Sequence, residues 1–142
     1  MDFRVNIRSD VPVYVQIENL IQFAISSGEL TPHDQLPTIK QMSEQTGINL
    51  NTVAKAYRDL EVMEFVYTRQ GIGVFVSKDA PRKCRPKVYE QNLKKLYALA
   101  QEAKAAGIPR KFLNEILRES FAAEAEPYDD VPTNLLSIAK KK

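Results

Sequence analysis

The chain has 142 residues, of which 44% are hydrophobic and 27% charged, which suits about one folded domain with an appendage. This composition argues against general disorder, and we expect a soluble globular protein. The single cysteine, Cys84, excludes an intrachain disulfide, and together with the single histidine, His33, it leaves too few ligands for a structural zinc site. We expect no metal and no cofactor.

The N-terminal residues hold no apolar run of signal-peptide length, and no stretch of about 18 apolar residues occurs anywhere. We therefore expect a cytoplasmic protein with no membrane partner. The charge is unevenly distributed. Residues 1–80 carry seven Lys or Arg against ten Asp or Glu, residues 81–111 carry nine against two, and residues 112–142 carry four against six. The three segments have net charges of −3, +7 and −2, which give the total of +2.

The first half of the chain predicts two helices with clear ends. Residues 3–7 alternate between apolar and polar types, which favours a short edge strand or an extended arm. Pro12 then begins a helical stretch, VYVQIENLIQFAIS, which Gly28 ends as a left-handed cap. Thr38 and Gln41 form a capping-box pattern that begins a second, shorter helix, and Gly47 ends that helix.

Residues 49–63 predict a third, amphipathic helix that Asn49 is placed to cap. Its inward face has apolar and aromatic residues, namely Val53, Ala56, Tyr57 and Leu60. Its outward face carries Asn51, Lys55 and Arg58. Amide, ammonium and guanidinium groups can hydrogen-bond base edges and phosphates. An ordinary surface helix also has a polar face, so this helix alone does not decide the function.

Two short runs rich in β-branched and aromatic residues, 65–69 and 73–77, predict a β-hairpin. Three helices followed by a hairpin are the order of a winged helix-turn-helix domain, with the hairpin as the wing. Arg69 and Gln70 would then lie at the wing tip, where side chains can reach a minor groove or its phosphates. The alternative is an ordinary hairpin that closes a small core.

Residues 79–87 contain two prolines and four cations, Arg82, Lys83, Arg85 and Lys87, and predict a basic linker. Either this run is a solvated linker or, if the protein binds DNA, it is an arm that contacts phosphates.

Residues 88–125 predict a helical hairpin, whose two helices are joined by Ala-Gly-Ile-Pro. Its apolar positions include Tyr89, Leu93, Leu96, Tyr97, Ala100, Phe112, Leu113, Ile116 and Leu117. This hairpin is too small to bury both of its faces alone, so it packs either on the winged helix or on a second copy of the chain. Residues 126–142 predict an irregular tail with one short docking turn at Leu135, Leu136 and Ile138.

Four motifs between Pro12 and Val76 resemble the GntR family of bacterial transcription regulators, and within it the short YtrA subfamily. They are PVYVQI, LPTIKQMSE, NTVAKAYRDLE and GIGVFV. The resemblance implies a mainly α fold with a small β-hairpin. A winged helix-turn-helix DNA-binding domain would occupy residues 1–78, and a small helical dimerisation segment would follow it.

By position, the resemblance places DNA contacts on nine residues: Thr38, Lys40, Asn49, Asn51, Thr52, Lys55, Arg69, Gln70 and Gly71. The helical wheel adds Arg58. Lys40 replaces the usual arginine and loses its bidentate geometry, and Leu50 stands where many members carry arginine or proline. His33 and Glu64 replace glycines, at about 1 kcal/mol each if the backbone there is left-handed.

These observations together predict a sequence-specific transcriptional regulator of the repressor type, which binds an inverted-repeat operator as a homodimer. The alternative is a winged helix that binds other proteins, which the net charge of −3 over residues 1–80 leaves open. An enzyme is disfavoured because the sequence has no nucleophile–base pattern, P-loop or dinucleotide fingerprint. A small-molecule effector could lodge between dimer helices, but no polar cluster marks a pocket for it.

Overall fold

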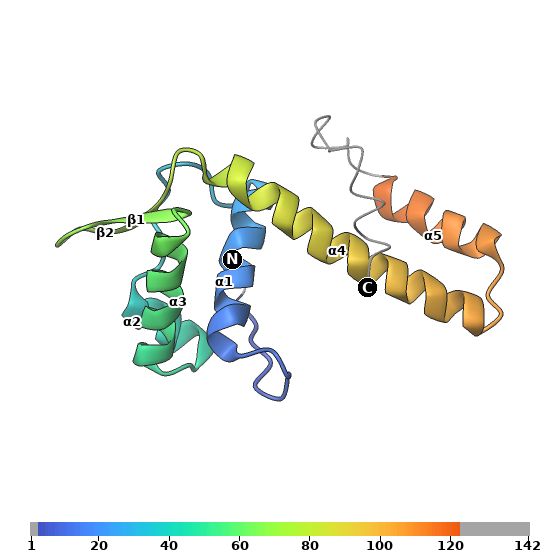
Figure 1. Cartoon of the computed structure of the whole chain (residues 1–142), viewed down its shortest axis with the longest axis horizontal. Helices are drawn as coiled ribbons and strands as arrows, with labels where there is room; N and C mark the ends of the chain where they lie inside the picture. Colours follow the sequence, from blue (N-terminus) through green and yellow to red (C-terminus); the bar gives the residue numbers. More distant parts are fainter. Residues whose placement is uncertain (1–2, 123–142) are drawn as a thin grey trace. The chain divides into compact units, whose positions relative to one another are not determined.

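The computed structural model describes residues 3–122, which form five helices and one two-stranded antiparallel sheet (Figure 1). In chain order the elements are α1 (Val13–Ser27), α2 (Ile39–Thr46), α3 (Leu50–Val62), β1 (Val66–Arg69), β2 (Gly73–Val76), α4 (Ala80–Ala105) and α5 (Arg110–Phe121). The predicted class, mainly α with a small β-hairpin, is confirmed. The predicted tail and docking turn lie outside the described residues.

The described residues divide into two compact units, one up to Val88 and one from Tyr89 onward. The core of the first unit lies where α1 and α2 pack against α3. Ile17, Ile21 and Ile25 repeat every four residues along α1 and are at most 1% exposed. Burying an aliphatic side chain of this size stabilises the fold by about 1.5–3 kcal/mol, so this stripe fixes the orientation of α1.

The helix ends lie where the capping residues predict them. The Thr38 hydroxyl oxygen accepts a hydrogen bond from the Gln41 backbone N–H at 3.1 Å, and the Gln41 side chain accepts one from the Thr38 N–H at 2.9 Å. Gly28 and Gly47 end α1 and α2 in the left-handed conformation, with φ of 83° and 70°. The Asn49 side chain caps α3 by accepting from the Asn51 N–H at 2.8 Å.

The hairpin pairs β1 with β2 in an antiparallel register that places Arg69 opposite Gly73. A third extended segment runs along the other edge of β2. The His33 N–H donates to the Val76 carbonyl at 2.9 Å, and the Leu36 N–H donates to the Val74 carbonyl at 2.8 Å. The hairpin is therefore joined to the segment that leads into α2, and its position relative to α2 and α3 is fixed.

The N-terminal segment forms no strand within the residues that the structure describes, and it enters a turn at residue 7. Phe3 is only 7% exposed and belongs to the core. The Gln16 side chain of α1 holds the backbone of Asn6, where the chain enters the turn before α1. Its amide accepts from the Asn6 N–H at 2.8 Å and donates to the Asn6 carbonyl at 2.9 Å.

The region predicted as a linker, residues 79–87, is mostly helical: residues 80–87 form the first turns of α4. Pro86 lies inside this helix. The prolines and cations of this region indicated a linker, but the region also carries an apolar pattern that is typical of a helix. Ala80, Cys84 and Val88 recur every four residues and are buried, the first two within the core of the first unit. Burial of this stripe stabilises the helix despite the backbone hydrogen bond that Pro86 cannot donate.

The second unit contains the later turns of α4 and all of α5, which meet at a turn with Gly107 at φ 81°. Leu93 and Leu113 are half-buried there, whereas most other apolar side chains of the two helices are exposed. Among residues 3–122, no helix has the length and apolar composition needed to cross a membrane.

Two residues in the described part of the chain have a positive φ without being glycine: His33 at 71° and Glu64 at 61°. These are the two positions where the sequence carries a larger residue in place of an expected glycine. Glu64 forms an ion pair with Lys83 of α4, and the two charged groups are 2.9 Å apart. Both side chains of this pair are at least 37% exposed, so its contribution to stability is small.

We predict that Glu64→Gly is about 0.5–1 kcal/mol more stable than Glu64→Ala, because both variants remove the ion pair and only glycine relieves the left-handed strain. Urea denaturation of the two variants measures this difference. Equal stabilities would show that the backbone at this turn is not strained.

Candidate nucleic-acid interface

The inward face of α3 is fixed by apolar packing and by one hydrogen bond. Val53 and Leu60 are fully buried, and Tyr57 is 4% exposed. The Tyr57 hydroxyl donates to the Pro37 carbonyl at 2.6 Å. Since Pro37 immediately precedes the cap of α2, this bond ties α3 to the start of the helix before it. Burial also raises the pKa of Tyr57 well above its usual value, so the hydroxyl stays a donor.

The outward face of α3 presents exposed polar groups. Asn51 and Arg58 are exposed, as is Lys40 on α2. Within the part of the chain that the structure describes, no hydrogen bond or ion pair occupies the side chains of these three residues. An asparagine amide can donate to and accept from one adenine edge, and a lysine or arginine can bind a phosphate. This face therefore carries hydrogen-bond donors and acceptors that are complementary to the base edges and phosphates of duplex DNA.

The two capping residues of the predicted site serve the fold and still retain donors. Thr38 and Asn49 are exposed, and each uses an oxygen to cap its own helix. The Thr38 hydroxyl proton and the Asn49 amide protons remain available to an anion. Both helix N-termini also carry the partial positive charge of the helix dipole. Thr52, in the first turn of α3, is half-buried.

Lys55 differs from the other cations predicted to contact DNA. Its ammonium lies 2.9 Å from the Asp59 carboxylate and 4.4 Å from the centre of the Tyr14 ring on α1. The side chain is 46% exposed, so it can still be reached from solvent. A phosphate contact by Lys55 would compete with Asp59, and we expect Lys55 to contribute less than the wheel position alone suggests.

A buried carboxyl lies beside this ion pair, and no sequence motif indicated it. Glu18 of α1 is 8% exposed. Burial, followed by the hydrogen bond and repulsion from Asp59, raises the pKa of Glu18 from 4.5 to about 7. The Lys55 hydrogen bond instead lowers the pKa of Asp59. The weak signal in the sequence was that Glu18 and Gln22 interrupt the apolar side of α1 at a spacing of four.

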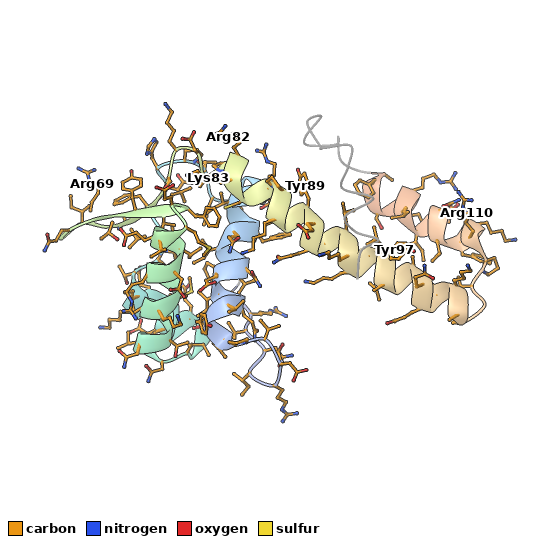
Figure 2. All side chains as sticks on the ribbon, viewed as in Figure 1. Arg69, Arg82, Lys83, Tyr89, Tyr97 and Arg110 are labelled. Atoms are coloured by element: carbon orange, nitrogen blue, oxygen red, sulfur yellow. The ribbon has the colours of Figure 1, made fainter. Side chains whose placement is uncertain are left out.

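The wing tip carries the third predicted group of contacts. Arg69, Gln70 and Gly71 are all exposed, and Gly71 has φ of 75°. In Figure 2, Arg69 lies toward the free end of the hairpin. Arg69 pairs with Gly73 at the last register position of the sheet. The backbone of Arg69 is therefore held by the hairpin, and its guanidinium projects from the end of the paired strands.

The basic run lies on a helix and is partly engaged by the protein. Arg82 and Lys87 are exposed, and Arg85 is half-buried. Lys83, which Figure 2 labels beside Arg82 at the start of α4, forms the ion pair with Glu64 described above. The run therefore cannot extend along DNA as an unfolded arm. Only cations on the exposed side of α4 could approach a phosphate.

The residues predicted for dimerisation form an apolar groove between α4 and α5. Seven of the nine line it: Leu93, Leu96, Tyr97, Ala100, Leu113, Ile116 and Leu117. Phe112 is 53% exposed outside the groove, and Tyr89 is half-buried in the first turns after the unit boundary. Among the lining residues, Leu96, Ile116 and Leu117 are 44–58% exposed.

Two capped helices joined by a tight turn, an outward polar face on the second, and a hairpin beyond it define a winged helix-turn-helix protein of the class that binds duplex DNA. Residues 13–76 match the family model described as "Bacterial regulatory proteins, gntR family". The chain is also 30% identical over 112 residues to the HTH-type transcriptional repressor YtrA of Bacillus subtilis (strain 168), a match that covers 79% of this chain and 86% of that protein. The chain belongs to the GntR family.

Solved structures agree with this assignment. A transcriptional regulator from Oenococcus oeni superposes with a TM-score of 0.59 at 27% identity, covering 82% of this chain and 97% of that one. The DNA-binding domain of AraR in complex with operator ORX1 superposes with a TM-score of 0.50 at 28% identity, covering 54% of this chain and 99% of that one. Other curated relatives at 36–37% identity match over only 60–64% of their own length.

The shifted pKa of Glu18 predicts a pH-dependent stability. A carboxyl whose folded pKa is raised favours folding below its unfolded value of 4.5, and this contribution is lost as the pH rises toward about 7. Asp59 acts in the opposite direction only near or below its ordinary value of 3.8. We therefore expect the free energy of unfolding to fall, on the order of 1 kcal/mol, between pH 4.5 and pH 7.

Glu18→Gln should remove most of that fall, because the amide stays neutral and can still donate to Asp59. Urea denaturation of both proteins at pH 5 and pH 7.5 measures the effect. The assignment would be wrong if the variant kept the full pH dependence of the parent.

Proposed function

We propose that this chain is a sequence-specific DNA-binding transcriptional regulator that acts as a repressor, and that it binds an inverted-repeat operator as a homodimer. The observation that carries the proposal is the outward face of α3, where Asn51 and Arg58 are exposed and unpaired among the described residues. This face lies on a helix whose opposite side is locked into the core. Such rigid presentation is what base readout in a major groove requires.

A homodimer is supported by the apolar groove of the second unit. Its exposed leucine, isoleucine and tyrosine side chains would lose contact with water if a second copy covered them. A closed two-fold dimer presents two identical recognition helices. Their spacing would set the separation of the two half-sites at about one helical turn or slightly more.

The alternative function is a winged helix that binds other proteins, which the net charge of −3 over residues 1–80 leaves open. The salt dependence of binding discriminates between the two. A protein that neutralises several phosphates loses a large part of its affinity for random duplex between about 50 and 200 mM salt, because bound counterions are released. A protein-binding module would show no such loss of affinity for random duplex with rising salt.

The test is to select fragments of the source genome with the purified full chain, sequence them, and measure binding to the enriched site and to random duplex across that salt range. We expect one enriched inverted repeat, bound at least about 1,000-fold more tightly than random duplex. No enrichment, together with no measurable random binding at about 50 mM salt, would refute the proposal.

Asn51→Ala and Lys40→Ala should separate sequence readout from phosphate contact. Asn51→Ala should lower the preference for the selected site over random duplex by at least about 30-fold, since each of the two half-sites loses a base contact worth ~1–3 kcal/mol. Lys40→Ala should weaken binding to the selected site and to random duplex by the same factor and, because a dimer loses two phosphate contacts, reduce the salt slope by about two. Fluorescence anisotropy with both duplexes measures this. If the two variants behaved alike, the assigned roles would be wrong.

Leu96→Glu should produce a monomer, because it places a charge in the apolar groove that the second copy is proposed to cover. Ala98→Glu is the matched control, since Ala98 is exposed on the same helix and does not line the groove. Sedimentation at micromolar concentration should show a monomer for the first variant and a dimer for the second. A monomeric parent protein would refute the homodimer.

A further inference from the structure

Leu50, the first residue of α3, is 51% exposed. Two residues earlier, Ile48 packs against the core and anchors the entry into the helix. In the same helix, Val53, three residues later, is completely buried. The fold therefore uses the apolar residues on both sides of Leu50, and it leaves much of the Leu50 side chain in solvent.

The neighbours of Leu50 are the polar groups of the proposed DNA-reading surface. Asn49 and Asn51 flank it directly, and both are exposed. The N-terminal residues of a recognition helix are those that contact base edges in a major groove. A leucine in this place can neither donate nor accept a hydrogen bond, so it cannot read a purine edge or hold a phosphate.

One apolar group is available to it on a major-groove base edge, the methyl group at C5 of thymine. We propose that Leu50 is a specificity-determining residue that packs its side chain on a thymine methyl in each operator half-site. This inference rests on the proposed function of the chain as an operator-binding regulator. It adds the identity of one base and the chemical group by which that base is read.

The effect is measurable without any protein variant, because replacing thymine by deoxyuridine removes only the C5 methyl and keeps every hydrogen-bonding group. Burying one methyl group corresponds to about a fourfold change in affinity, and two half-sites give about 15-fold. We expect this loss when one symmetry-related pair of thymines in the selected operator is replaced, and little change at thymines that the protein does not contact.

The variant Leu50→Ala completes the test. It should bind the unmodified operator about 10-fold more weakly than the parent and should be insensitive to deoxyuridine at that one pair of positions. Val62→Ala is the matched control, because Val62 is an 81% exposed aliphatic residue at the other end of α3. This control should keep the parent's affinity and its full response to deoxyuridine. When a C·G pair replaces the T·A pair at the same position, a methyl group at C5 of the cytosine should restore part of the parent's affinity. The same methyl group should not change the affinity of Leu50→Ala.

Two results would overturn the inference while leaving the proposed function intact. One is a specifically bound operator in which no thymine replacement affects the parent and Leu50→Ala differently. The other is a Leu50→Ala variant that loses affinity equally for operator and random duplex, which would place Leu50 against the sugar–phosphate backbone. Failure to select any operator would instead refute the proposed function, and this inference with it.

Discussion

The burial of one face of α3 is the constraint on which the remaining structure depends. Val53, Ala56, Tyr57 and Leu60 fill the space against the neighbouring helices and the hairpin, and Tyr57 is also bonded to the Pro37 carbonyl. A helix turns by about 100° per residue, so a slip of one residue would expose this apolar face and turn Asn51 and Arg58 away from solvent. The packing that stabilises the domain thus also determines which polar side chains of α3 face solvent, and these are the side chains that we propose read DNA.

The electrostatics of the first unit suit a polyanionic partner, because residues 1–80 have a net charge of −3 and the four cations at residues 82–87 raise the net charge of residues 1–88 to +1. Several of its acids are occupied within the protein: Asp59 pairs with Lys55, Glu64 pairs with Lys83, and Glu61 accepts from the Thr68 N–H at 3.1 Å. Burial raises the pKa of Glu18 to about 7, well above that of an exposed carboxyl. The cations left on the proposed DNA-facing side are few, so in the proposed dimer affinity depends on two linked half-sites bound together.

The sequence predicted the parts of the fold that depend on local signals. The capping box at Thr38, the glycines at positions 28 and 47, and the Asn49 cap are local hydrogen-bond chemistry, and the structure confirms each of them. The start of α4 was not predicted, because Pro81 and Pro86 suggested a break while the burial that outweighs it involves residues distant in sequence. The pairing of Lys55 with Tyr14 and the proximity of Glu18 to Asp59 also depend on how α1 packs against α3, which no local pattern shows.

The most direct test of the central claim, that the first turns of α2 and α3 and the wing tip face the operator, is amide hydrogen exchange of the full chain with and without the selected DNA. The first backbone N–H groups of a helix lack intrahelical partners and exchange readily, so contact with DNA should slow them. We expect slowed exchange at residues 38–40, 49–52 and 69–72, with residues 93–117 unchanged. Slowed exchange only in residues 93–117, or no change at the first three segments with the operator fully bound, would contradict the account.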